Sequence, residues 1–204
     1  MKIYVIDGCL IGSPAKQIMA TTKLQLGKRL RELRTAQHIS IRTLAARTNF
    51  SPSFISQIEK GRASPSIASL ERIAAVLDTS LGGFFTSEIP DDIRIIRYSD
   101  REELVSSWSR AKIQALGPMA GPSKTEAVMI TLLPHGRSGK RPYAHSGEEF
   151  GLIFEGEITL TLGSEIHTLR RGDAVTFGSD IPHLWENRTR KTSRVVIVSP
   201  RFAH

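Results

Sequence analysis

The sequence has one cysteine, Cys9, among 204 residues, which excludes a disulfide framework and any zinc site built from several thiolates. No apolar run approaches the roughly 18 residues that a membrane-spanning helix needs. The mildly apolar N-terminus is interrupted by Asp7, so it does not read as a signal peptide. Nothing around Cys9 would lower the pKa of a redox-sensing thiolate. These absences predict a soluble, cytoplasmic protein that does not contact a membrane.

Charge is unevenly distributed along the chain. Residues 1–86 contain 12 Lys/Arg and 5 Asp/Glu, a balance of +7, whereas residues 87–204 contain 16 and 15, a balance of +1. A basic half joined to a neutral half favours a polyanionic partner, such as nucleic acid, for the first half only. Hydrophobic residues make up 40% of the chain, enough for the packed cores of one large or two small domains.

Residues 23–86 have the periodicity of short helices. Leu26, Leu30 and Leu33 recur on one helix face, and the pieces 41–48 and 52–60 follow. Ser51 with Pro52 is typical of a helix start, and Gly61 of a helix end. The pattern therefore predicts four or five short helices with brief connections.

From about residue 125 the period changes to two. Alternating runs such as Ile158–Leu162 and Phe150–Phe154, separated by glycines at fairly regular spacing, indicate an all-β sandwich or barrel. The run from Glu102 to Leu116 fits a short helix or an edge strand. We therefore divide the chain into an N-terminal extension, expected to be a flexible tail rather than a packed strand, a helical domain, a linker with leading strands, and a β domain: 1–18, 19–86, 87–124 and 125–204.

The helical run closely resembles the XRE family of helix-turn-helix domains, related to phage repressors. About 60 residues match without an insertion, at family spacing in Arg34, Leu44, Ala45, Ile55, Ile58, Glu59, Gly61, Pro65 and Leu70. The resemblance implies a lambda-repressor-like domain of five short helices that binds a double-stranded DNA operator. It also implies an internal ion pair between Arg34 and Glu59.

In this family the second helix of the motif, here 52–60, enters the major groove, where its side chains reach base edges and phosphates. Gln57 can pair with adenine through two hydrogen bonds. One departure is Ile41, which stands where the family often has a phosphate-binding Gln, so the neighbouring Arg42 and Thr43 are its local substitutes. The expected DNA-binding residues are Arg42, Thr43, Ser51, Ser53, Ser56, Gln57, Lys60 and Arg62.

The β half resembles the cupins, which are jelly-roll barrels. His145, Glu149 and Gly156 match the first cupin motif, and Gly172, His183 and Asn187 match the second. Tyr143 replaces the family's first histidine, and Gly178-Ser179-Asp180 replaces its Pro-x-Gly. Tyr143, His145 and Glu149 share strand parity, so on a strand they would face one cavity together with His183 from a later strand.

Two imidazoles and one carboxylate suit a divalent metal such as Zn, Fe, Mn or Ni. His145, Glu149 and His183 are therefore the candidate metal ligands, although a protonated Tyr143 is a poor fourth ligand. A metal-free pocket for a small effector, lined by Tyr143, His145, Glu149 and His183, is equally compatible with the motif. So is a simple His145–Glu149 pair inside the barrel.

Together the two resemblances imply a transcriptional regulator, not an enzyme: a repressor whose cupin domain senses a small metabolite and dimerises. A homodimer is expected because one helix-turn-helix buries too little surface for tight, specific binding. The alternatives are a metal-dependent cupin enzyme, a dioxygenase or isomerase, tethered to a DNA-binding domain, and an effector-free repressor or antitoxin. The missing histidine argues against the enzyme, and the long β domain argues against the effector-free repressor.

Overall fold

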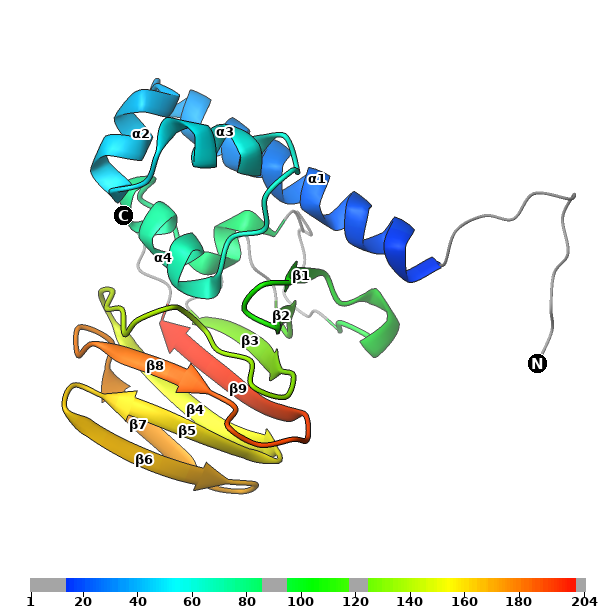
Figure 1. Ribbon diagram of the computed structural model, residues 1–204, viewed down its shortest axis with the longest axis vertical. Coiled ribbons are helices and arrows are strands. Elements are labelled where there is room, and N and C mark those ends of the chain that lie inside the picture. Colours follow the sequence, from blue (N-terminus) through cyan, green and yellow to red (C-terminus); the bar gives the residue numbers. More distant parts are fainter. Residues whose placement is uncertain (1–13, 86–94, 118–124, 201–204) are drawn as a thin grey trace, which may run out of the picture.

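A computed structural model describes residues 14–85, 95–117 and 125–200, and side chains from residue 23 onward (Figure 1). A helical region packs on one side of two β-sheets, as expected from the change of period. Expectations for residues 1–13, including Cys9, for 86–94 and 118–124 within the predicted linker, and for 201–204 lie outside the described residues. No helix in the described ranges has the length and hydropathy of a membrane span.

The helical region contains four α-helices, α1 (Pro14–Ala36), α2 (Ile41–Thr48), α3 (Pro52–Glu59) and α4 (Ile67–Val76). The expected fifth α-helix is wrong for the described chain, since only a 3-10 turn, η1 (Leu81–Phe84), follows α4, and its two glycines disfavour a longer helix. Helix α1 begins at Pro14, inside the segment assigned to the flexible extension.

Serine caps fix where the later helices begin. The hydroxyl oxygens of Ser40, Ser51 and Ser66 each accept a hydrogen bond from the backbone N–H three residues on. Helix α2 ends at Asn49, which adopts the left-handed conformation with φ of 54°. These caps confirm the expected starts at Ser51 and Ser66 and set the short turn between α2 and α3.

Helices α1 and α3 are joined by a close crossing and a buried ion pair. A side chain at Gly27 would place its Cβ 2.5 Å from the carbonyl oxygen of Ile58, so only glycine fits there. The Arg34 guanidinium donates to both carboxylate oxygens of Glu59, at 2.6 and 3.0 Å, and to the Ile39 carbonyl at 2.8 Å. The expected Arg34–Glu59 pair is confirmed, and its side chains are only 10% and 7% exposed.

The β region is two antiparallel sheets, which confirms the sandwich. The larger sheet has the order β1-β2-β3-β9-β4-β7 and the smaller one β6-β5-β8. In chain order the strands are β1 (Glu103–Ser106), β2 (Ala111–Ala115), β3 (Thr125–Leu132), β4 (Glu148–Glu155), β5 (Glu157–Leu162), β6 (Glu165–Arg170), β7 (Ala174–Gly178), β8 (His183–Glu186) and β9 (Ser193–Pro200), with a 3-10 turn, η2 (Tyr98–Asp100), before β1. The segment 102–116 is thus a pair of strands.

Alternation in β4 predicts the strand but not its orientation. Glu149, Gly151 and Ile153 face the interior, whereas Phe150 and Phe154 are 40% and 54% exposed. Gly151 is needed on the inner face, because a Cβ there would lie 2.8 Å from the indole of Trp185. The apolar residues of β4 therefore cover the outer face of the larger sheet.

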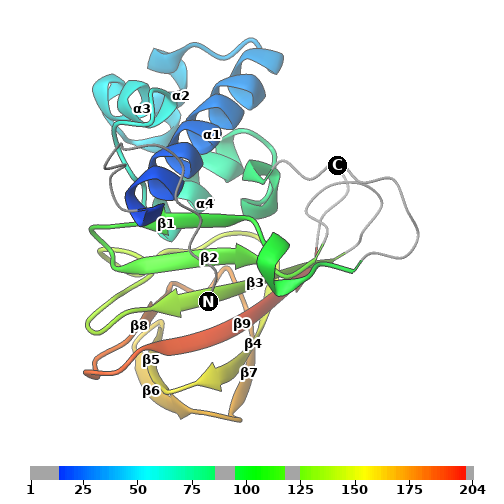
Figure 2. The ribbon, with the colours of Figure 1, turned by 90° about the vertical axis from the view of Figure 1, so that its right-hand side faces the viewer.

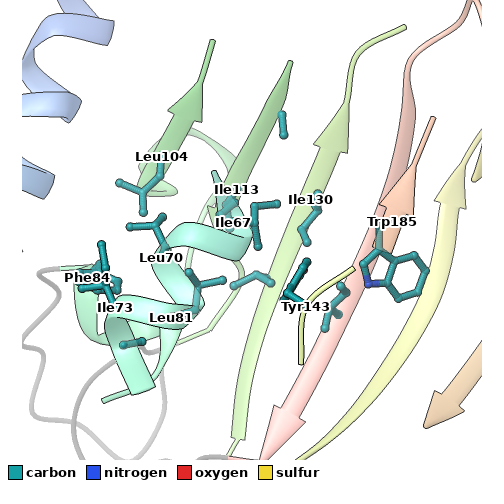
Figure 3. Close-up of a cluster of buried hydrophobic side chains, with 14 of the residues drawn as sticks. Ile67, Leu70, Ile73, Leu81, Phe84, Leu104, Ile113, Ile130, Tyr143 and Trp185 are labelled. Carbon is teal, nitrogen blue, oxygen red and sulfur yellow. The ribbon is translucent and has the colours of Figure 1, made fainter. Parts of the chain in front are cut away.

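The two regions share a buried apolar interface (Figures 2 and 3). Ile67 and Leu70 of α4 and Leu81 and Phe84 of η1 belong to the same cluster as Leu104, Ile113 and Ile130 of strands β1, β2 and β3. Backbone contacts support it, since Ala68 N–H donates to the Ser138 carbonyl at 3.1 Å. The Ser64 hydroxyl donates to the Val105 carbonyl at 2.6 Å, and Gly82 N–H donates to the Glu126 carboxylate at 3.1 Å. Helix α4 is thus held by both regions.

Glu59→Ala should lower the free energy of unfolding by about 3–5 kcal/mol, because it leaves the Arg34 guanidinium buried without its carboxylate. Glu32→Ala is the matched control, since its contacts with Lys28 and Arg29 are exposed and contribute about 1 kcal/mol or less. Urea unfolding of the full chain, followed by circular dichroism, measures both. Equal stabilities of the two variants would contradict the buried pair.

Candidate functional site

Most of the expected DNA-binding side chains lie on one exposed surface of α2 and α3. Arg42, Thr43, Ser51, Ser53, Gln57, Lys60 and Arg62 are exposed, and Ser56 is partly buried. Ile55 and Ile58, on the opposite side of α3, are fully buried in the helical core. The sequence of α3 therefore separates a core face from a polar outer face.

Local hydrogen bonds constrain two of these side chains. The Ser51 hydroxyl oxygen caps α3 by accepting from Phe54 N–H at 3.1 Å, which leaves its own O–H as a donor. The Gln57 amide donates weakly to the Ser53 hydroxyl at 3.4 Å, so both groups can exchange this contact for a base or phosphate. Arg47, an exposed cation in the last turn of α2, was not among the expected residues, because nothing in its spacing separates it from an ordinary surface arginine.

A second candidate site lies inside the barrel, where the cupin residues meet. One ligand atom from each of His145, Glu149 and His183 falls within 4.8 Å of the others. His145 Nε2 is 2.9 Å from Glu149 Oε1, and His183 Nε2 is 3.7 Å from the same oxygen. The expected convergence of two imidazoles and a carboxylate is therefore present.

His183 is oriented as a metal-binding imidazole would be. Its Nδ1 lies 2.9 Å from the Ile181 carbonyl, which can only accept, so Nδ1 carries the proton and Nε2 keeps a lone pair. Burial lowers the pKa of His183, which favours this neutral form. Nε2 of His183 and Oε2 of Glu149 are buried without a hydrogen-bond partner among the described residues. These orphaned atoms make the cluster a fitting donor set for a divalent metal.

His145 is the cationic member of the cluster. Burial lowers its pKa, but the hydrogen bond to Glu149 and the negative charges of Glu71 and Glu149 outweigh burial and raise the pKa to about 9. At neutral pH, without a metal, His145 is therefore an imidazolium paired with Glu149. A metal at this site would displace the proton of His145.

Tyr143 joins the cluster as a neutral phenol. It pairs with His183 through an isolated backbone bridge, and the two rings lie 4.6 Å apart. Burial, followed by the charge of Glu149, raises the pKa of Tyr143 well above its usual value. The parity argument for this residue was incomplete, since β4 begins only at Glu148. Tyr143 and His145 come from the extended segment before that strand.

The second cupin motif has a structural part. The Asn187 amide donates to the carbonyls of Leu132, Leu133 and Lys191, at 2.9, 3.1 and 2.7 Å, and so ties the end of β8 to β3. Gly172 has a φ of 95°, which its turn before β7 requires. Asn187 and Gly172 therefore support the barrel, and His183 alone of this motif reaches the cluster.

A cavity of about 430 Å³ opens beside the cluster, and both regions line it. Tyr143, His145 and Glu149 line it from the barrel, and Ile67 and Glu71 line it from α4. Desolvation raises the pKa of Glu71 to about 7, against the lowering effect of the charge on His145. The sequence did not identify Glu71 as a site residue, because it lies in the helical half and matches no cupin motif.

Comparisons with known proteins agree with this division. A helix-turn-helix family model matches residues 30–84, and a cupin domain model matches residues 128–199. The chain is 30% identical to the HTH-type transcriptional regulator PuuR of Escherichia coli strain K12, over 87% of this chain and 96% of PuuR. The chain belongs to the HTH-type transcriptional regulators.

Two further relatives support this assignment. The HTH-type transcriptional regulator SutR of Escherichia coli strain K12 is 25% identical over 82% of this chain and 89% of its own. A crystal structure of an HTH_3 family transcriptional regulator from Vibrio cholerae superposes with a TM-score of 0.68 and 27% identity, covering 91% of this chain and 99% of the other. The two-domain arrangement is thus that of a solved regulator.

His183→Ala should lower affinity for zinc by at least about 100-fold, because it removes an oriented nitrogen ligand and the loss of an outer-shell partner alone lowers affinity about 10–100-fold. Tyr143→His should raise the affinity by adding a third imidazole. The control is His167→Ala, which alters a half-exposed histidine of β6. Elemental analysis after dialysis against zinc compares the proteins, and equal metal content in all of them would exclude this cluster as a metal site.

Proposed function

We propose that this protein is a sequence-specific DNA-binding regulator, acting in the cytoplasm, whose affinity for its operator depends on a small ligand in the cupin cavity. The observation that carries the proposal is the exposed polar face of α3, held on the helical core by the buried Arg34–Glu59 pair. Recognition through a helix in the major groove needs such a rigidly held helix with its N-terminal side chains free.

In this proposal the exposed residues have two roles. Gln57 and Ser53, one turn apart on α3, read base edges. The other residues contact phosphates or sugars and fix the orientation of the domain: Arg42, Thr43, Ser51, Ser56, Lys60 and Arg62. The balance of +7 over residues 1–86 supports this arrangement, because phosphate neutralisation supplies most of the non-specific affinity.

The cavity is the proposed effector site, with Tyr143, His145 and Glu149 on its wall and His183 behind them. A divalent metal such as Zn, Fe, Mn or Ni at His145, Glu149 and His183 would supply a Lewis-acidic centre that binds an oxygen or nitrogen atom of the effector. The same three residues would serve a metal-dependent dioxygenase or isomerase, which is the second candidate function. We favour sensing, because the relatives that match along most of the chain are regulators.

A homodimer is part of the proposal, and the larger sheet offers a surface for it. Phe150 and Phe154 are exposed on the outer face of β4, and Leu152 lies between them. The cross-strand partners of Phe150 and Leu152 are Val198 and Val196, which extend the apolar face onto β9. An exposed apolar sheet face of this kind fits an interface between two copies of the chain.

Gln57→Ala should weaken binding to the preferred operator by about 1–3 kcal/mol and relax the preference at one base pair. Lys60→Ala should weaken binding to all sequences alike and make the slope of log affinity against log salt shallower by about 1. Fluorescence anisotropy on duplexes selected by the protein measures both effects. Arg171→Ala, which removes an exposed cation from the far end of the barrel, should change neither (Figure 2). Equal affinity for selected and random duplexes would refute the proposal.

Phe154→Asp should convert the dimer into a monomer, because it places a charge in a desolvated contact. Ile166→Asp introduces the same charge at a position on the smaller sheet that is 61% exposed, and it should leave the dimer intact. Sedimentation equilibrium gives the two masses. A Phe154→Asp protein that sediments as a dimer would place the interface elsewhere.

A further inference from the structure

Glu71 is the residue through which the DNA-binding region enters the cupin cavity. It lies on α4, is partly buried, and lines the cavity opposite the barrel. It has no hydrogen bond or ion pair to any described residue, although its charge interacts with those of His145, Glu149 and Glu126. A carboxylate that is largely removed from water and left without a partner is costly unless a ligand compensates it.

The cavity around Glu71 carries an excess of negative charge. Its wall includes five carboxylates, Glu71, Asp78, Glu126, Glu148 and Glu149, against the cations Arg29 and His145. Glu126 is already engaged with the Ser80 hydroxyl and Gly82 N–H. Glu149 is only 5% exposed, and its Oε2 has no partner among the described residues. A positively charged group between Glu71 and Glu149 would supply the compensation that both carboxylates lack.

We propose that Glu71 and Glu149 form the two sides of an interdomain site for a positively charged group, so that a ligand in the cupin cavity is bound partly by the DNA-binding region itself. The positive group is an organic ammonium or a divalent cation. This inference rests on the proposed function of the cavity and assigns a charge to its ligand. The raised pKa of Glu71 is consistent with it, since a cation would favour the ionised carboxylate.

The placement of Glu71 also explains how occupancy would reach the DNA-binding surface. Helix α4 contributes Ile73 and Ala74 to the helical core that supports α3, and Ile67 and Leu70 to the interface with the sheet. A ligand changes DNA affinity only as far as it binds the two arrangements of the protein differently. A cation held by one carboxylate from each region favours the arrangement in which α4 is docked on the barrel.

The test measures binding to the full chain without DNA, by isothermal titration calorimetry. The ligands are n-butylammonium, 1-butanol and butyrate, which share a chain length and differ in charge, together with Zn²⁺ alone. The proteins are wild type, Glu71→Gln, which keeps the shape and removes the charge, and Glu32→Gln, the same change at an exposed site of α1. Hydrogen exchange of the α4 amides, with and without each ligand, reports on coupling.

Wild type and Glu32→Gln should bind n-butylammonium more tightly than 1-butanol or butyrate, and Glu71→Gln should lose about tenfold or more. Exchange in α4 should slow on binding in the first two proteins only. If Zn²⁺ shows this Glu71 dependence instead of n-butylammonium, the site is assigned to a metal ion. Glu71→Gln that binds both cations as wild type does, or wild type that prefers butyrate, overturns the inference. Because DNA is absent, this result is independent of whether the protein binds an operator.

Discussion

The packing of α4 against the larger sheet is the interaction on which both regions depend. Ile73 and Ala74 complete the helical core that holds α3, while Ile67 and Leu70 bury apolar surface against strands of the barrel (Figure 3). Burial of several large aliphatic side chains contributes on the order of 1.5–3 kcal/mol each, far more than the few hydrogen bonds between the regions. The two regions are therefore parts of one packed unit, and changes in the cavity bear directly on the helix that supports the DNA-binding surface.

Opposite electrostatic environments characterise the two sites. The α3 surface is exposed and basic, so its charges are screened and serve affinity and orientation on DNA. The cavity is enclosed and acidic, so each charge there is strongly coupled to its neighbours, as the raised pKa values of His145 and Glu71 indicate. Screened charges suit a long polyanion, whereas coupled charges in an enclosed cavity suit discrimination among small ligands.

Much of the fold could be predicted from the sequence, since caps and periodicity are local signals. Ser51, Ser66 and Gly61 marked helix ends correctly, and the XRE-like spacing identified the buried Arg34–Glu59 pair. The cupin spacing likewise brought His145, Glu149 and His183 together. The outward orientation of Phe150 could not be read, because alternation alone does not say which face of a strand is inside. Glu71 was missed because its position in the cavity follows from domain packing, which no local pattern encodes.

The most direct test of the account is a footprint of the full-length protein on duplexes selected from a random pool. A dimer that reads DNA through two copies of α3 should enrich a pseudo-palindrome and protect two half-sites about one helical turn apart, on one face of the duplex. Enrichment of no sequence, or protection that spreads without half-sites, would contradict the assignment of α3 as the recognition helix.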